Sequence, residues 1–490
     1  MTTKGGNQMK LSRFAGNIAL AVSVLLSSVT AMASDKWPMY QANPSHTGYI
    51  PISINAEDIS FRWKKKLGSL ALNPVTAAKG LIFVSEIGYF GTQHFYVLLK
   101  NGSLAWGKSF SDIYSVNPPS YDNDKVYIQT GNHTPGTYLR AYYAQSGNLV
   151  FQSPHAAQWE RYMSPTIYEK TVYISGGYYG GMYSFSGTTG RQHWFYDDLP
   201  QVDQWTPAVD DKWAYTYIGS LFVVDRLTGK TAFNILDSGE ESAQVPMLGG
   251  ADDVFVINGG MLSKFNTATK KIAWQKIFSF SEDYTGQPAL ANGVIYAGTT
   301  LGSLAALDQA TGKRLWTWKN PSGQSVTGNI VVTDSHVFLG TTSKIYCVDL
   351  MTHHAVWSYA ASGHLTLAES ALYVADSSGN LTAFRLGIGD LFARSNVSFD
   401  KTPINTTTLK KIWIKNVGDK PITINDIISG SDDFTVETTP TSFVLEPNRS
   451  KGIDVSFTPT TAAIIETDLL IKSDDQNEPE MTVHLSGKGI

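Results

Sequence analysis

The sequence predicts an all-β protein, an eight-bladed β-propeller followed by an immunoglobulin-like β-sandwich. Three observations lead to this prediction. An aromatic residue, usually Trp, returns at intervals of 39 to 45 residues between positions 63 and 357, which is the length of one four-stranded propeller blade. A tight turn containing Gly precedes most of these aromatic residues. After residue 388 the repeat stops, and short alternating strands without the aromatic residue take its place.

The repeated aromatic residues are predicted to be structural anchors. Most follow a tight turn by four residues, as in Thr311-Gly312-Lys-Arg-Leu-Trp316. The Gly supplies the positive φ that such a turn needs, and the large ring can fill the gap between neighbouring blades. The anchors are Trp63, Trp106, Phe151, Trp194, Phe233, Trp274, Trp316 and Trp357.

Each unit repeats one order of strands. A position that is usually proline comes first, and a β-branched and aromatic run follows several residues later, as in Pro288 and the run 294–296. An alternating strand, the Gly turn and the anchor complete the unit. The last unit ends at Leu386 without an anchor, whereas an orphan strand containing Trp63 precedes the first unit. We therefore expect the N-terminal strand to close the ring as the outer strand of the last blade.

Residues 1–33 are typical of a secretory signal peptide. Lys10 and Arg13 precede a mostly apolar stretch of about 16 residues, and Ala31-Met32-Ala33 is a small-residue cleavage pattern. Either Met1 or Met9 could begin this segment. The stretch is too short for a membrane span, and no Cys follows it to carry a lipid. We expect an exported protein, periplasmic or secreted, without a transmembrane segment or lipid anchor.

Charge and cysteine content exclude several function classes. Residues 34–490 carry 35 basic and 42 acidic residues, a balance that argues against nucleic acid as a partner. Cys347 is the only cysteine, which excludes a disulfide and a thiolate metal cage, and it is expected to be a buried core residue. His353 and His354 are the only adjacent histidines, and a solvated turn is favoured there over a metal site. No catalytic, cofactor-binding or metal-ligating set is predicted.

The most complete repeat, Leu-x-Ala-Leu-Asp-x-x-Thr-Gly-x-x-x-Trp at 304–316, resembles the Trp-docking repeat of the pyrroloquinoline-quinone (PQQ) family of propellers. The opening segment, from Trp37-Pro38 to Thr47-Gly48, is similar to that of many exported members. The resemblance covers residues 35–388 and implies a quinoprotein-like fold. This family includes quinone-dependent dehydrogenases and cofactor-free proteins, such as the propeller lipoprotein of the outer-membrane β-barrel assembly machinery.

The sequence departs from the enzymes of that family. The resemblance implies that an alcohol dehydrogenase of this family would carry an adjacent Cys pair and a set of carboxylates and amides around calcium. Some of these enzymes also carry Cys-x-x-Cys-His haem segments. One cysteine excludes both cysteine patterns, and Asp122-Asn-Asp124 is favoured as a turn rather than a calcium site because a strand follows it. The chain therefore resembles the cofactor-free members more closely, and PQQ with calcium is the less favoured alternative.

Residues 396–490 are predicted to form the sandwich, joined by a linker at 389–395 to a propeller at 34–388. Short alternating strands such as 411–415 and turn signals every 8–12 residues are typical of an immunoglobulin-like domain. Asn416-Val-Gly-Asp419, Phe457-Thr-Pro459 and Leu485-Ser-Gly487 resemble the abnormal-spindle and hydin type of module. That resemblance implies adhesion, spacing or docking and no catalytic residues.

One end of the propeller is predicted to be a binding surface. The loops between the second and third strands of the first three units, 86–94, 132–138 and 177–180, are long and aromatic. Inter-blade loops at the same end add aromatic rings, an Arg and carboxylates. Binding surfaces use aromatic area for affinity and charge for register, although packing of the loops onto one another is an equal alternative. The predicted residues are Trp159, Arg161, Tyr162, Tyr178, Tyr179, Trp205 and Tyr284.

We therefore expect an exported, non-catalytic binding or scaffold protein whose propeller face is a platform for a protein or another surface ligand. Two alternatives stay open. One is a PQQ-dependent oxidoreductase, and the other is a carbohydrate-binding surface protein.

Overall fold

The computed structural model describes residues 36–158, 161, 163–237, 242–250, 252–475 and 479–490. Apart from one short 3-10 turn, η1 (Ala56–Asp58), the regular elements in these ranges are all β-strands. None of the described residues belongs to a helix with the length and apolar character needed to cross a membrane.

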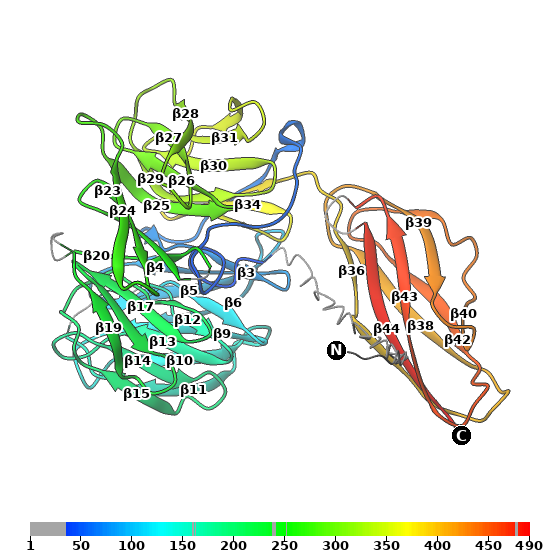
Figure 1. Cartoon of the computed structure of the whole chain (residues 1–490). Coiled ribbons are helices and arrows are strands. Elements are labelled where there is room, and N and C mark those ends of the chain that lie inside the picture. Colours follow the sequence, from blue (N-terminus) through cyan, green and yellow to red (C-terminus); the bar gives the residue numbers. More distant parts are fainter. Residues whose placement is uncertain (1–35, 159–160, 162, 238–241, 251, 476–478) are drawn as a thin grey trace, which may run out of the picture. The chain divides into compact units, whose positions relative to one another are not determined.

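Strands β1 to β35 form eight antiparallel units, which are the propeller blades (Figure 1). Blade 1 has β2 (Ala71–Leu72), β3 (Thr76–Ala78), β4 (Leu81–Ile87), β5 (Gln93–Leu99) and β6 (Leu104–Phe110). Blade 2 has β7 (Ser115–Val116), β8 (Ser120–Asp122), β9 (Lys125–Gly131), β10 (Tyr138–Tyr143) and β11 (Leu149–Pro154). Blade 3 has β12 (Thr166–Tyr168), β13 (Thr171–Ser175), β14 (Met182–Ser186) and β15 (Gln192–Tyr196). Blade 4 has β16 (Ala208–Val209), β17 (Trp213–Ile218), β18 (Leu221–Asp225), β19 (Thr231–Ile235) and β20 (Ala243–Gln244), which pairs with β17.

The second half of the ring follows the same order. Blade 5 has β21 (Met247–Leu248), β22 (Asp253–Asn258), β23 (Met261–Asn266) and β24 (Lys271–Ile277). Blade 6 has β25 (Tyr284–Ala291), β26 (Val294–Thr299), β27 (Ser303–Asp308) and β28 (Arg314–Lys319). Blade 7 has β29 (Val326–Val332), β30 (His336–Thr341), β31 (Ile345–Asp349) and β32 (Ala355–Tyr359). One parallel bridge between Gln287 and Asn329 joins blades 6 and 7.

Blade 8 is built from both ends of the propeller segment. It has β33 (His364–Ala368), β34 (Ala371–Ala375) and β35 (Asn380–Arg385), and its outer strand is β1 (Ser60–Lys66). In the antiparallel pairing of β1 with β35, Trp63 lies opposite Ala383. The predicted closure by the N-terminal strand is confirmed, and it covers the edge that β35 would otherwise expose.

The eight anchors connect each blade to the next. A Cβ added to the turn glycine of the following blade would lie 2.9 Å from Trp63 at Gly102 and 2.5 Å from Trp194 at Gly229. Indole nitrogens also donate to the turns, as Trp63 Nε1 does to the Lys100 carbonyl at 2.9 Å. Three further anchors pack on a turn glycine in the same way, namely Trp106 on Gly147, Phe151 on Gly190 and Trp274 on Gly312. The other three contact a side chain of the next blade: Phe233 contacts Lys270, Trp316 contacts His353 and Trp357 contacts Phe384.

Residues 37–52, which we call the inner segment, are dark blue in Figure 1 and contact seven blades in chain order, at or next to their first strands. Backbone hydrogen bonds join its successive residues to blades 1, 2, 4, 5, 6 and 7 at 2.6–3.0 Å, and the Tyr40 amide donates to Ser164 of blade 3. Because the first strands line the axis of the ring, the inner segment crosses the central channel. It closes the end at which the first strands turn into the second strands.

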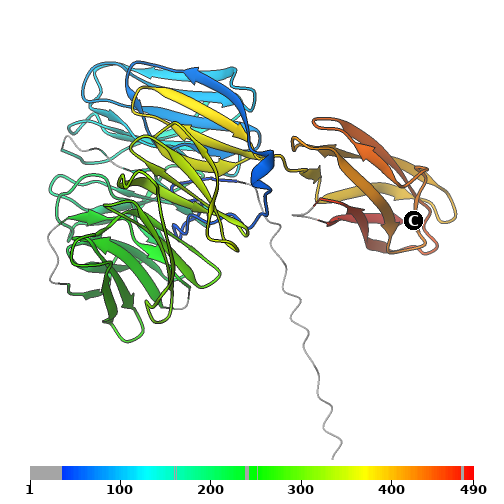
Figure 2. The same cartoon turned by 90° about the horizontal axis from the view of Figure 1, so that it is seen from above.

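The sandwich consists of two sheets, which lie face to face in Figure 2. One contains β36 (Leu391–Ala393), β38 (Thr408–Asn416), β42 (Ser450–Phe457) and β40 (Phe434–Val436). The other contains β37 (Asn396–Thr402), β44 (Glu480–Gly489), β43 (Ile464–Ser473), β39 (Ile422–Ser429) and β41 (Phe443–Leu445). Since β36 pairs with β38, the sandwich begins at Leu391, earlier than the predicted residue 396. Its apolar core includes Ile414, Phe434 and Phe457.

Candidate functional site

The candidate site lies at the end of the propeller opposite the inner segment, where the loops between second and third strands meet the inter-blade loops. We call this the loop end. The first of these loops is shorter than predicted, because β4 extends to Ile87 and β5 begins at Gln93. A buried carboxylate holds this hairpin: Glu86 Oε2 accepts from the His94 amide at 3.0 Å and lies 2.6 Å from His94 Nδ1.

Aromatic side chains stand at the tips of the loops of blades 1 and 2. Tyr89 and Phe90 are 55% and 59% exposed. Both rings pack edge-on against Tyr114, with centroid distances of 5.4 and 5.1 Å. The Phe90 amide also donates to the Tyr114 carbonyl at 3.2 Å. These contacts fix two exposed rings on a half-buried third ring.

A second aromatic group lies on blades 2 and 3. The hydroxyl of Tyr178 is 3.1 Å from Nε2 of His133, and the two rings meet edge to face. Tyr179 packs beside Tyr178 with centroids 5.4 Å apart, and it is 78% exposed. The two predicted tyrosines therefore come together as an accessible, held pair.

Arg161 lies between these blades. Its backbone nitrogen donates to Asp203 Oδ1 at 3.2 Å, and its carbonyl accepts from the Gln204 amide at 2.9 Å. The guanidinium lies 4.8 Å from the centre of the Tyr89 ring, a cation–π contact. Arg161 is half-buried, and no carboxylate of the described residues lies within ion-pair distance of it.

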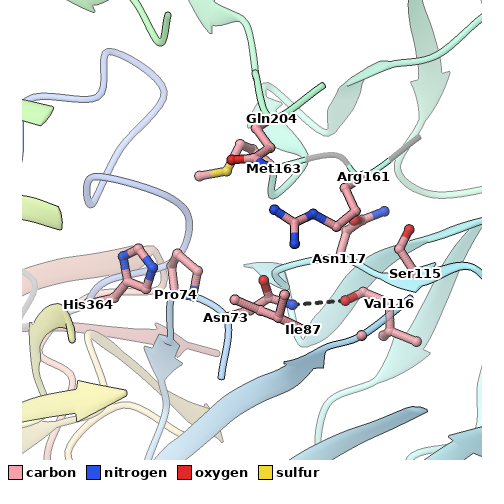
Figure 3. Close-up of a pocket in the computed structure, with 11 residues that line it drawn as sticks. Asn73, Pro74, Ile87, Ser115, Val116, Asn117, Arg161, Met163, Gln204 and His364 are labelled. Atoms are coloured by element: carbon pink, nitrogen blue, oxygen red, sulfur yellow. Dashed lines mark hydrogen bonds between the residues drawn. The ribbon is translucent and has the colours of Figure 1, made fainter. Parts of the chain in front are cut away.

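A cavity of about 90 Å³ opens at the loop end, at the mouth of the central channel. Figure 3 shows the guanidinium of Arg161 pointing into it, with Asn73 and Pro74 on blade 1 and His364 on blade 8. Asn73 Nδ2 donates to the Val116 carbonyl at 2.9 Å, which links blades 1 and 2 at the rim. The inner segment closes the opposite end, so a ligand in this cavity enters from the loop end.

His364 also lines this cavity. Its Nδ1 is buried and has no hydrogen-bond partner among the described residues. Burial lowers the pKa of His364 to about 4, so the imidazole is neutral at neutral pH. At that pH Arg161 is the ionised side chain of the lining.

Two of the predicted surface residues do not belong to the surface. Trp205 is 2% exposed and packs in an apolar cluster with Trp194 and Leu199. Tyr284 is 3% exposed and packs edge-on against Phe278. Trp205 lies in the loop before β16 and Tyr284 is the first residue of β25, and both side chains belong to apolar clusters between blades. The prediction that they offer their rings to a partner is wrong. Trp159 and Tyr162 lie outside the described residues.

The cavity residues Asn73 and His364 were not predicted. Each directly precedes the position that is usually proline at the start of a unit, namely Pro74 and Leu365. The corresponding positions of blades 6 and 7 are Gln287 and Asn329. A polar residue at this place of the repeat is therefore the signal that could have located the channel mouth.

These residues do not fit PQQ with calcium. The cavity is well below the 300–1,000 Å³ that is typical of sites for cofactor-sized ligands. Its lining contains no carboxylate, whereas calcium sites are built from oxygen ligands with carboxylates among them. Nowhere in the described ranges do three or more His, Cys, Asp or Glu residues gather as a metal site would need.

Two family models match the chain. The model described as outer membrane protein assembly factor BamB matches residues 51–235 and 242–359. The model described as Cep192 domain 4 matches residues 391–490, which is the sandwich as the structure delimits it. The prediction of a PQQ-repeat propeller followed by an immunoglobulin-like domain is confirmed.

Individual proteins show the same likeness at low identity. The chain is 27% identical over 154 residues to lupanine 17-hydroxylase [cytochrome c] of a Pseudomonas species, which is 29% of this chain and 22% of that protein. It thus spans about a fifth of the length of the curated relatives it matches. The structure of BamB from Moraxella catarrhalis has a TM-score of 0.51 at 17% identity, covering 67% of this chain and 99% of that one. For a europium-containing methanol dehydrogenase the TM-score is 0.57 at 13% identity, covering 71% and 98%.

Proposed function

The chain belongs to the propeller family described as outer membrane protein assembly factor BamB, and on that premise we propose that it is an exported, non-catalytic scaffold that binds a partner protein. The loop end is the binding surface in this proposal. The signal-peptide pattern of residues 1–33 supports export to the periplasm or the cell exterior.

The observation that carries this proposal is the set of exposed, ordered aromatic rings at the loop end. Tyr89, Phe90, Tyr178 and Tyr179 are each more than a third exposed, yet each packs against a neighbouring ring. Rings that are already held lose little conformational freedom on binding, so their apolar area contributes to affinity at low entropic cost. Arg161 adds a second suitable residue type, because Arg and Tyr are both enriched among the residues that contribute most of the binding energy at the centre of interfaces.

A partner-retention experiment tests the proposal. The double variant Tyr178→Ala, Tyr179→Ala removes the most exposed ring pair, and we expect at least about tenfold weaker retention of the partner with an unchanged melting temperature. Tyr143→Ala is the matched control, because Tyr143 is 51% exposed but ends β10 next to the Gly147 turn, at the opposite end of the ring. Equal loss in both variants would contradict the assignment of the surface to the loop end.

The PQQ-dependent oxidoreductase is the second candidate. Its support is the likeness to lupanine 17-hydroxylase and to the quinone alcohol dehydrogenases, which is confined to about a quarter of this chain. The cavity size and the lining without carboxylates oppose it. Titration with PQQ and calcium tests it directly, because a ligand at 100 times its Kd stabilises the fold by about 2.7 kcal/mol. We expect no shift in the melting curve, and a saturable shift would favour the oxidoreductase.

Carbohydrate recognition is the third candidate, because aromatic rings on a surface can also stack on sugars. It differs from the scaffold in the ligand that the same rings would bind. Titration with a panel of soluble oligosaccharides separates the two, and we expect no saturable binding.

A further inference from the structure

We infer that the mouth of the central channel is a carboxylate-binding subsite, with Arg161 as its charged ligand, and that it takes an Asp or Glu side chain of the partner protein. The inference rests on the proposed scaffold function and adds the chemistry of the partner segment. It also gives the cavity at the loop end a role that the exposed rings do not supply.

Arg161 supplies the positive charge of the proposed subsite. Its guanidinium is half-buried at the cavity, points into it (Figure 3) and lies on the Tyr89 ring at 4.8 Å. No carboxylate of the described residues lies within 4.0 Å of it. A partly desolvated guanidinium that forms no ion pair with the described residues gains from a ligand carboxylate, which its planar fork can bind through two parallel hydrogen bonds.

In the rest of the wall, His364 brings a buried Nδ1 without a hydrogen-bond partner among the described residues. It is neutral at neutral pH because burial lowers its pKa to about 4, so it adds no charge to the wall. Gln204 lines the same cavity in a left-handed backbone conformation, with φ at +64°. Its backbone amide donates to the Arg161 carbonyl at 2.9 Å, so these two lining residues are tied together.

A cavity of about 90 Å³ has room for one short side chain and not for a cofactor. The inner segment closes the other end of the channel, so the side chain must come from the loop end. A partner segment that covers the exposed rings of Tyr89 and Phe90 passes over the mouth, because Arg161 joins the Tyr89 loop to the cavity.

The carboxylate of Asp203 should lower the affinity of the subsite for a ligand carboxylate. Asp203 Oδ1 accepts from the Arg161 backbone nitrogen at 3.2 Å, so its negative charge lies near the proposed ligand. An Asn at this position keeps the acceptor oxygen and removes the charge. We therefore expect Asp203→Asn to strengthen carboxylate binding, whereas a merely structural role of Arg161 would leave it unchanged.

The test is calorimetric titration of the purified protein with two blocked pentapeptides, Gly-Glu-Gly-Glu-Gly and its Gln counterpart, together with sodium acetate. We expect the Glu peptide to bind more tightly than the Gln peptide and than acetate, with weaker binding at high salt. Arg161→Ala should lower the affinity for the Glu peptide by about tenfold, the usual size of a charged hydrogen-bond pair. Arg161→Lys should lose less, because the charge remains.

The matched control is Arg140→Ala. Arg140 also lies on aromatic rings, 5.2 Å from the centre of Phe110 and 4.8 Å from that of Tyr138, but it does not line the cavity. Its loss should leave peptide affinity unchanged. Equal binding of the two peptides, acetate as strong as the Glu peptide, or unchanged affinity in Arg161→Ala would each overturn the inference. If the Tyr178, Tyr179 variant still loses the partner in that case, the proposed scaffold stands and only the subsite fails.

Discussion

The indole of Trp316 lies flat on the imidazole of His353, with ring centroids 4.3 Å apart and ring planes at 16°. Most other blades have Gly at this place of the turn, such as Gly229 beneath Trp194, and blade 5 has Lys270. His353 adopts φ of +58°, the left-handed conformation that Gly takes without strain. The turn of blade 7 thus keeps the same backbone conformation. The His353 imidazole packs on the anchor Trp316, where a turn glycine packs on the anchor in most other blades.

The depth of the anchors differs, and this gives a prediction about stability. Trp194 is 8% exposed, and its Nε1 donates to the Arg226 carbonyl at 3.0 Å, whereas Trp316 is only half-buried. Trp194→Ala should lower the free energy of unfolding by about 3–5 kcal/mol, and Trp316→Ala should cost less. Urea unfolding at neutral pH measures both losses. A larger loss at Trp316 would show that the blade contacts, and not burial, determine the cost.

Stability should fall in mild acid because of His46. This buried residue of the inner segment bonds through Nδ1 to the Pro246 carbonyl at 3.0 Å. Burial lowers its pKa from 6.5 to about 4, with the Pro246 hydrogen bond acting in the opposite direction. Below pH 6.5 the unfolded chain therefore binds a proton that the folded chain does not, and this contribution to stability is lost as the pH falls toward 4.

The variant His46→Gln isolates this effect. Its amide can replace the hydrogen bond to the Pro246 carbonyl but cannot ionise. Denaturant unfolding measured from pH 7 to pH 4 should show a shallower decline in the variant than in the wild type. His155 and His364 also have a pKa lowered to about 4 by burial, so part of the decline should remain. Identical pH slopes in the two proteins would contradict the assignment to His46.

Deletion of residues 34–66 should destroy the closed ring. It removes β1, which covers β35, and the inner segment, which bonds to blades 1 to 7 at or next to their first strands. An uncovered β35 edge favours strand pairing between molecules, so we expect aggregation in size-exclusion chromatography. A soluble deletion product that melts cooperatively would rule out this role of the N-terminal strand.

The sequence predicted the ring well because its determinants are local and repeated. The spacing of Trp63, Trp106 and the other anchors reflects blade length, and the missing anchor after Leu386 indicated which strand closes the ring. The burial of Cys347 followed from its alternating strand and is confirmed. The path of the inner segment could not be predicted, because residues 37–52 have no periodicity and obtain their partners from seven separate blades.

The candidate site was predicted only in part. Loop length and composition indicated Arg161, Tyr178 and Tyr179, and these residues lie at the loop end. Loop length and composition do not indicate how deeply a side chain is buried. Trp205 and Tyr284 were therefore predicted to be on the surface, although both are buried. The channel mouth was missed because Asn73 and His364 are almost 300 residues apart, and only ring closure brings blades 1 and 8 together.

In the proposed function, the protein is a scaffold whose loop end binds a partner protein. The most direct test immobilises the wild type, the Tyr178→Ala, Tyr179→Ala variant and the Tyr143→Ala control, and measures the affinity for the envelope protein that the wild type retains. We expect at least about tenfold weaker binding for the double variant and unchanged binding for the control, with equal melting temperatures. Unchanged affinity in the double variant, or loss of the partner only when residues 391–490 are removed, would contradict this proposal.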